Sequence, residues 1–207
     1  MKKEYILGIL FFSGLWGISE AVLGDALYRA DVPYASVFLT VIGFIILTFS
    51  RVYFPQKGTA TLIAACAMLY KFLNSPFFAC HLLAIFLMGV CYDIFFSTSR
   101  IKNRAICAAA ATYLSYTLFA LMITYVFRYN YWTQAGFGKI LQYIGIGGTI
   151  AAIGCAVFVP FAFRLGEQLK TMAAMPFRLR LQPAPGGISL VTTGLWVFSI
   201  AAYFLHS

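Results

Sequence analysis

Long apolar segments separated by short polar connections run through the whole chain. Reading them against glycine, proline and charged residues predicts helices at about 5–24, 35–50, 59–74, 77–97, 104–127, 138–163 and 188–205. A hydrocarbon core of about 30 Å takes roughly 20 apolar residues as a helix, so most of these segments can cross a bilayer. The pattern predicts an all-α, polytopic transmembrane bundle of six to seven helices.

Composition strengthens this prediction. Of 207 residues, 62% are hydrophobic and only 10% are charged, and the mean hydropathy is +0.86. A soluble domain is about half apolar and a quarter charged. We therefore expect one integral membrane domain over residues 1–207, with a basic cytoplasmic loop at 164–187 and an extra C-terminal helix at 188–205.

The distribution of basic residues predicts the orientation. All of the 15 lysines and arginines except Arg29, Lys71, Arg128 and Lys139 fall on one side of the predicted spans. The positive-inside rule then places the N-terminus on the cytoplasmic side of the membrane. We expect this membrane to be a bacterial-type cytoplasmic membrane. The net charge of +9 is explained by orientation and by contact with anionic lipid, and we expect no nucleic-acid binding.

Glu20 is the most informative single residue. It lies inside the first apolar segment, where an acid costs about 2.5 kcal/mol or more unless it faces a partner or a water-filled cavity. Residues three or four positions away share its helix face, and these include Trp16 and Gly17. An intramembrane acid beside an aromatic ring and a glycine is typical of a pocket wall or of a close helix contact.

Other polar residues are predicted at the same outer depth as Glu20. Counting 1.5 Å per helical residue brings six residues from four segments to this level. They are Glu20, Asp25, Lys71, Asn74, His81 and Arg128. We expect Glu20, Trp16, Lys71, Asn74 and His81 to line an outward-facing pocket, with the connection 25–34 as its lid.

Two interpretations of this cluster stay open. Glu20 either contributes to a ligand site or forms a structural ion pair, with Lys71 as its expected partner. His81 either lines the pocket or hydrogen-bonds locally near its helix start, and Lys71 could instead extend to the membrane interface. Because the basic residues outnumber Glu20 at this depth, the sequence favours an anionic or zwitterionic solute.

Small residues mark two helix faces that could pack closely against another helix. Gly14, Gly17 and Ala21 lie on the first segment, and Gly147 and Ala151 lie on the sixth. Small residues four positions apart let transmembrane helices approach closely. We interpret these residues as candidates for packing against a partner chain.

The remaining chemistry-bearing residues indicate no catalytic centre. Asp93, the second intramembrane acid, is predicted near the cytoplasmic end, where a structural pairing with Arg100 or Lys102 is expected. The chain contains no G-x-S-x-G, H-E-x-x-H or nucleotide-binding glycine motif. Its five cysteines lie in apolar segments without a C-x-x-C pair, so no metal and no cofactor is expected.

Three stretches resemble the substrate-binding membrane subunits (S components) of energy-coupling-factor transporters. Residues 11–24, FFSGLWGISEAVLG, are similar to the small-residue-rich first helix of that family, and residues 25–34 resemble its pocket-closing loop. Residues 74–93 resemble a proline-led helix ending in a glycine-x-x-x-acid pattern, here Gly89 and Asp93. The resemblance implies binding of a small polar metabolite, with transport driven by a transmembrane coupling subunit and partner ATPases.

The sequence therefore predicts a multi-pass solute-binding or transport subunit. Two alternatives remain. One is an accessory or assembly subunit that packs on a partner through its glycine faces, and the other is a lipid-active membrane enzyme with Glu20 or His81 as base.

Overall fold

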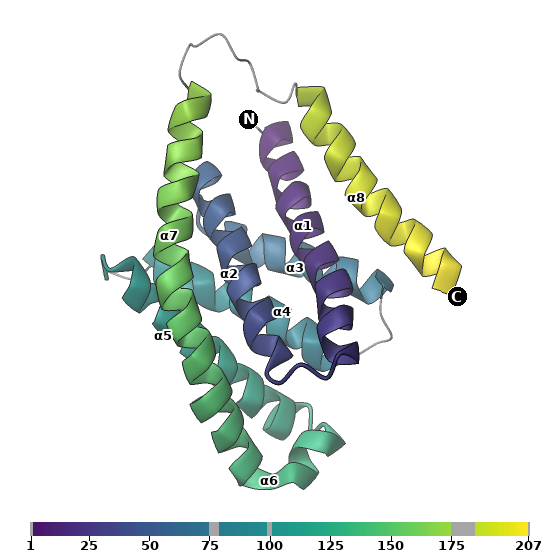
Figure 1. Cartoon of the computed structure of the whole chain (residues 1–207), viewed down its shortest axis with the longest axis vertical. Coiled ribbons are helices and arrows are strands. Elements are labelled where there is room, and N and C mark those ends of the chain that lie inside the picture. Colours follow the sequence, from purple (N-terminus) through teal and green to yellow (C-terminus); the bar gives the residue numbers. More distant parts are fainter. Residues whose placement is uncertain (1, 75–78, 99–100, 175–184, 207) are drawn as a thin grey trace.

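The computed structural model describes residues 2–74, 79–98, 101–174 and 185–206, and helices make up nearly all of them (Figure 1). The α-helices are α1 (Lys2–Arg29), α2 (Ala35–Tyr53), α3 (Thr59–Asn74), α4 (Ala79–Asp93), α5 (Arg104–Leu121), α6 (Asn130–Gln142), α7 (Gly148–Ala174) and α8 (Pro185–His206). Three π-helical turns extend them: η1 (Ile94–Thr98), η2 (Met122–Val126) and η3 (Tyr143–Gly147). Within these ranges the protein is all-helical, and a helix is found at each of the seven predicted positions.

Five helical stretches in the described part of the chain are long and apolar enough to cross a membrane. They are Lys3–Arg29, Ala35–Tyr53, Cys80–Ser97, Arg104–Val126 and Asn130–Met172. Two shorter apolar helices cover Thr59–Lys71 and Gly187–Ser199. The chain thus has the helices of a multi-pass membrane protein.

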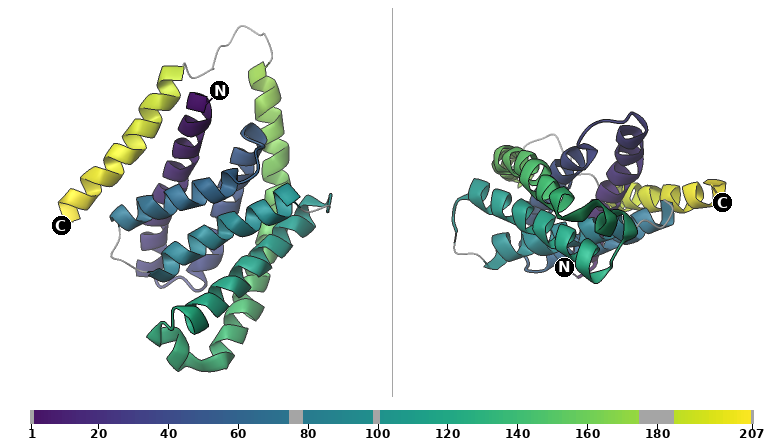
Figure 2. Two further views of the ribbon diagram at one scale, coloured as in Figure 1. Left: turned by 180° about the vertical axis from the view of Figure 1, so that it is seen from behind. Right: turned by 90° about the horizontal axis from the view of Figure 1, so that it is seen from below.

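The helices form one bundle, as Figures 1 and 2 show. The long α7 packs along α2 and α5, while α1 packs against α2 and α3. Helices α3 and α4 pair and cross behind α1 and α2, and α8 lies along α1 and α3. Short α6 lies at one end of the bundle between α5 and α7.

Close approach in the core depends on two glycines. A Cβ at Gly43 of α2 would lie 2.9 Å from the Trp16 indole and 2.8 Å from Met88 Cε. A Cβ at Gly89 of α4 would lie 2.3 Å from Ala64 Cβ and 2.7 Å from a backbone oxygen of α3. The absence of a side chain at these positions lets α1, α2, α3 and α4 pack around the fully buried Trp16.

Three predicted boundaries are corrected. Helix α1 continues to Arg29, so only Ala30–Tyr34 remains of the expected 25–34 connection. Helix α7 continues to Ala174, so the first part of the expected 164–187 loop extends that helix. The sixth segment also begins earlier than predicted, because α6 and η3 run into α7 with a break at Gly136, where φ is 73°. Polar residues at these helix ends were interpreted as loops, and the helices in fact continue through them.

The small residues predicted to pack against a partner chain are covered from within this chain. Ideal Cβ atoms at Gly14 and Gly17 would lie 3.2 Å from Trp196 of α8 and 2.4 Å from Tyr70 of α3. Two hydrogen bonds of 3.0 Å also hold α8 against α1 and α3. Trp196 Nε1 donates to the Leu10 carbonyl, and Tyr70 OH donates to the Leu195 carbonyl.

On α7 and the preceding turn, the small residues face α2 and α5. Ala151 is fully buried and packs with Val37 and Tyr116. A Cβ at Gly147 would lie 3.5 Å from the Tyr116 ring. Ala21 is the exception on α1, where it remains partly exposed. These contacts account for Gly14, Gly17, Gly147 and Ala151 as internal packing positions.

Candidate functional site

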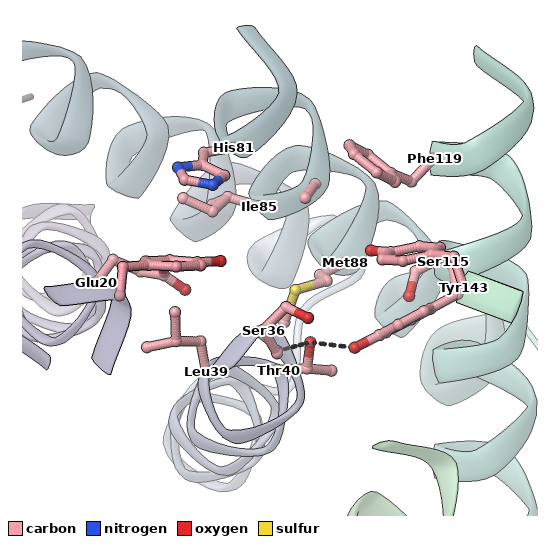
Figure 3. Close-up of a pocket in the computed structure, with 13 residues that line it drawn as sticks. Glu20, Ser36, Leu39, Thr40, His81, Ile85, Met88, Ser115, Phe119 and Tyr143 are labelled. Carbon is pink, nitrogen blue, oxygen red and sulfur yellow. Dashed lines mark hydrogen bonds between the residues drawn. The ribbon is translucent and has the colours of Figure 1, made fainter. Parts of the chain in front are cut away.

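A small polar cavity lies inside the bundle and is formed by α1, α2, α4, α5 and η3 (Figure 3). Its volume is about 50 Å³, which is room for about four water-sized groups. Figure 3 shows Glu20 on one side and Phe119 and Tyr143 on the other, with His81 and Ile85 above and Ser36 and Thr40 below. The lining residues are Glu20, Tyr28, Ser36, Leu39, Thr40, His81, Ala84, Ile85, Met88, Ser115, Tyr116, Phe119 and Tyr143.

Glu20 enters the cavity from α1 and is held by Lys71 of α3. Lys71 Nζ lies 3.3 Å from Glu20 Oε2 and donates a second bond of 3.2 Å to the Glu20 backbone carbonyl. Both residues are buried, each with 6% exposure. Lys71 therefore neutralises Glu20 from behind the cavity wall, and it is not among the residues that line the cavity.

Tyr28 and His81 form the outer rim. Their rings stack, with centroids 5.4 Å apart and an interplanar angle of 19°. Tyr28 is 45% exposed and His81 is half-buried, so the cavity meets the protein surface here. The stack joins the last turn of α1 to the first turns of α4, and separation of these rings would widen the entrance.

The inner end of the cavity carries hydroxyl groups. Thr40 Oγ1 donates to the Ser36 carbonyl at 2.8 Å and lies 3.3 Å from Tyr116 OH. Ser115, next to Tyr116 on α5, donates to the Thr112 carbonyl at 2.8 Å. Thr40, Ser115 and Tyr116 are each buried. Because the hydrogens of Thr40 and Ser115 are used in these bonds, their hydroxyl oxygens offer a ligand acceptor lone pairs.

Aromatic rings form the wall opposite Glu20. Tyr143 of η3 stacks on Tyr116 with centroids 4.8 Å apart, and Trp132 of α6 packs edge-on against Tyr143 at 5.1 Å. Phe119 completes the group at 5.5 Å from Tyr143. The π-helical turn that holds Tyr143 is a local distortion often found at functional sites. Short α6 thus supports the wall from outside through Trp132.

The structure brings together only part of the predicted pocket. Glu20 and His81 line the cavity, and Lys71 supports Glu20. Trp16 instead lies in the packed core at 0% exposure, and its Nε1 has no hydrogen-bond partner among the described residues. The side chain of Asn74 lies outside the described residues.

Two predicted residues lie on the surface. Asp25 forms an exposed ion pair with Arg29 at 2.8 Å, one helical turn apart. Arg128 is exposed in the turn between η2 and α6 and does not line the cavity. Equal depth along the helices placed both residues near Glu20, but depth does not specify the direction in which a residue faces around its helix.

Asp93 has a structural role, as expected, and its described partners are Thr61 and Ser97, while the expected partner Arg100 lies outside the described residues. Its Oδ2 accepts bonds of 2.8 Å from both the backbone N–H and the hydroxyl of Thr61, in the first turn of α3. Its Oδ1 accepts a 3.1 Å bond from Ser97. The carboxylate satisfies N–H groups that a helix start leaves unpaired. With Gly89 against α3, the glycine-x-x-x-acid pattern fixes α4 to α3.

Most of the cavity lining was not predicted. Ser36 and Thr40 are four residues apart on α2, and Ser115 and Tyr116 are adjacent on α5, so each pair marks a polar position in an apolar helix. That signal was available in the sequence. Tyr28 and Tyr143 carried none, because a tyrosine near a helix end is also what a membrane interface favours.

The described residues offer no centre for a metal ion. Within the placed parts of the chain, no three histidine, cysteine or acidic side chains come together. The groups that the described lining offers a ligand are one carboxylate, one imidazole, several hydroxyls and aromatic faces.

Comparisons with known proteins find no relative: no family model, no curated protein and no solved structure matches the chain. The resemblance to S components remains a prediction from the three sequence stretches. A function for this chain has to be inferred from the geometry of the cavity.

Proposed function

We propose that this protein is a membrane-embedded subunit that binds a small polar solute for transport. The observation that carries the proposal is the cavity among the helices of an apolar bundle, with Glu20, His81 and several hydroxyls on its wall. An ionisable residue inside a membrane is costly and usually faces a substrate path or a partner. Convergent polar groups in a concave, largely apolar site are typical of small-molecule binding.

The distribution of basic residues supports an orientation for this site. If the N-terminus lies on the cytoplasmic side of a bacterial-type membrane, α1 runs from the cytoplasmic side to the outer side. The Tyr28–His81 rim then faces the outside, and Ala30–Tyr34 is the connection nearest to it. The proposed cycle begins with solute entering past this rim and ends with its release toward the cytoplasm.

Energy for transport would come from other chains. The sequence contains no nucleotide-binding motif, and the resemblance to S components supports a transmembrane coupling subunit with ATPases as partners. The accessory-subunit alternative has less support, because Gly14, Gly17 and Gly147 already pack against this chain's own helices. Lipid contacts are expected over the exposed apolar residues of α7, such as Ile153, Val157 and Phe161.

Ligand screening of purified protein tests the proposal. Native mass spectrometry of gently solubilised protein should show a co-purified small molecule, and a broad metabolite screen should yield a compound that raises the melting temperature. Ala84 lines the cavity, so Ala84→Phe should abolish the shift. Ala135→Phe on the exposed surface of α6 is the matched control and should retain it. If no compound shifts the wild type and nothing co-purifies, the cavity is not a solute site.

A further inference from the structure

The charge balance around the cavity limits the charge of its ligand. Among the described residues that line it, Glu20 is the one carboxylate, and no lysine or arginine is present. Lys71 contacts Glu20 Oε2 from behind, at 3.3 Å. Of the basic residues behind the predicted excess of positive charge, Arg128 lies elsewhere and Lys71 is already paired, so only the His81 imidazole remains on the described lining.

A neutral pair in an apolar bundle disfavours any further net charge. Glu20 and Lys71 are both buried, and an uncompensated charge in such surroundings is strongly unfavourable. A cationic ligand would have to compete with Lys71 for Glu20, and an anionic one would meet no lysine or arginine among the described lining residues. A ligand without net charge avoids both costs.

The lining also has hydrogen-bonding capacity that suits a neutral group. No hydrogen bond from a described residue reaches Glu20 Oε1, so this oxygen can accept one from a ligand. At the inner end, Thr40 already donates to the Ser36 carbonyl and lies 3.3 Å from Tyr116 OH, so these hydroxyls offer a ligand N–H acceptor lone pairs. The volume of about 50 Å³ matches a group of about four non-hydrogen atoms.

From these observations we infer that the cavity binds an uncharged, amide-sized group, whose N–H donates to Glu20 Oε1 while Lys71 keeps the site neutral. This inference rests on the proposed solute-binding function and specifies the charge of the group that enters. It differs from the sequence-based expectation of an anionic or zwitterionic solute. That expectation counted Arg128, which lies outside the cavity, and Lys71, which is paired with Glu20.

Three probes of nearly identical shape test the inference directly. Acetamide, acetate and acetamidinium each have four non-hydrogen atoms in one plane and differ in charge. Purified wild-type protein is titrated with each probe, at constant ionic strength, while its melting temperature is recorded. At about ten times Kd, acetamide should raise the melting temperature by about 3–6 °C. Acetate and acetamidinium should bind at least about tenfold more weakly.

Variants of the pair should change the preferred charge. Lys71→Met leaves Glu20 uncompensated and should shift the preference to acetamidinium. Glu20→Gln leaves Lys71 uncompensated and should shift it to acetate. The double variant Glu20→Gln, Lys71→Met should again prefer acetamide. Asp25→Asn is the matched control, since it removes an exposed carboxylate of the same helix outside the cavity, and it should keep the wild-type preference.

The outcomes separate this inference from the proposed function. Stronger binding of acetate or acetamidinium to the wild type overturns the charge inference but leaves solute binding intact. The inference also fails if the single variants fold and keep the preference for acetamide. If the single variants do not fold, the order of binding of the three probes to the wild type and to the double variant still tests the inference. If no probe binds, the inference is overturned whether or not the broad metabolite screen finds a ligand, and only the screen decides the proposed function.

Discussion

Lys71 reaches from α3 to α1 and binds Glu20 twice, at the carboxylate and at the backbone carbonyl. The same carboxylate lines the cavity. The two sequence-based interpretations of Glu20 therefore do not exclude each other. The ion pair joins two helices, and its acid is also presented to the cavity. The stability of the ion pair and the availability of the Glu20 carboxylate to a solute are therefore linked.

The pair predicts a non-additive mutant cycle. Removing one partner of a buried ion pair typically costs 3–5 kcal/mol, because the other charge is left uncompensated. Glu20→Gln and Lys71→Met should each lower the free energy of unfolding by about this amount, and the double variant should recover part of the loss. Denaturant unfolding in detergent, followed by circular dichroism, measures the three values. Additive losses would show that the two residues act independently.

The exposed pair Asp25–Arg29 is the control for this cycle. Exposed ion pairs contribute about 0–1 kcal/mol, because solvent and salt screen them. Asp25→Asn should therefore change the free energy of unfolding by less than about 1 kcal/mol, although it makes the same chemical change one turn and a half along the same helix. A loss equal to that of Glu20→Gln would mean that burial does not distinguish the two acids.

Gly89 is predicted to be intolerant of any side chain. A Cβ there would lie 2.7 Å from the Ala60 carbonyl oxygen, which is backbone and cannot rotate away. Overpacking a core typically costs 1–3 kcal/mol, so Gly89→Ala should lower the melting temperature by several degrees. Gly138→Ala on α6 is the control, since no atom lies within 4 Å of its added Cβ. Equal melting temperatures for the two variants would contradict the close α3–α4 contact.

The sequence predicted the helices well for a simple physical reason. Apolar length and polar breaks are local properties, and seven of the helices followed from them. An ion pair of Glu20 with Lys71 was one of the two interpretations that the sequence left open, because two opposite charges in neighbouring apolar helices have few other partners. The helix extensions to Arg29 and Ala174 were missed, since polar residues at membrane boundaries look alike in helices and in loops.

The cavity itself was harder to predict. Depth along a helix follows from residue number, but the direction of a side chain depends on helix rotation and on which helices are neighbours. Trp16 shares a face with Glu20, yet the close approach of Gly43 puts it into the core. Tyr143 reaches the cavity through a π-helical turn that no local pattern indicated. Residues on different helices must therefore lie at equal depth to line one cavity, but equal depth alone does not bring them together.

Asp93 should prove to be a structural acid. It accepts two bonds from Thr61 and is 8% exposed. Asp93→Ala removes the acceptor from the backbone N–H and the hydroxyl of Thr61 and from the hydroxyl of Ser97, all part-buried, and the expected loss is about 2–3 kcal/mol in the free energy of unfolding. Thr61→Val removes only the hydroxyl donor and should cost less, about 1 kcal/mol. Solute binding should survive in both variants, because Asp93 does not line the cavity. Loss of binding in folded Asp93→Ala would assign it a functional role.

The orientation can be tested at two connections. Ala30 follows α1 and Ile101 precedes α5, and both are exposed in the structure. Ile101 is preferable to its neighbour Asn103, whose side chain caps α5 by accepting from two backbone N–H groups at 3.0 and 3.3 Å. Single cysteines at these positions are treated in intact cells with a membrane-impermeant thiol reagent.

Ala30→Cys should react from outside, and Ile101→Cys only after the cells are opened. This result is expected from the positive-inside rule, because Lys102 and Arg104 flank the second position while the first lies beside Arg29 alone. The wild-type protein reports background from its own cysteines, which are buried or half-buried. Labelling of Ile101→Cys in intact cells would reverse the orientation. The Tyr28–His81 rim would then face the cytoplasm, and the cavity would be a site for release or for a cytoplasmic ligand.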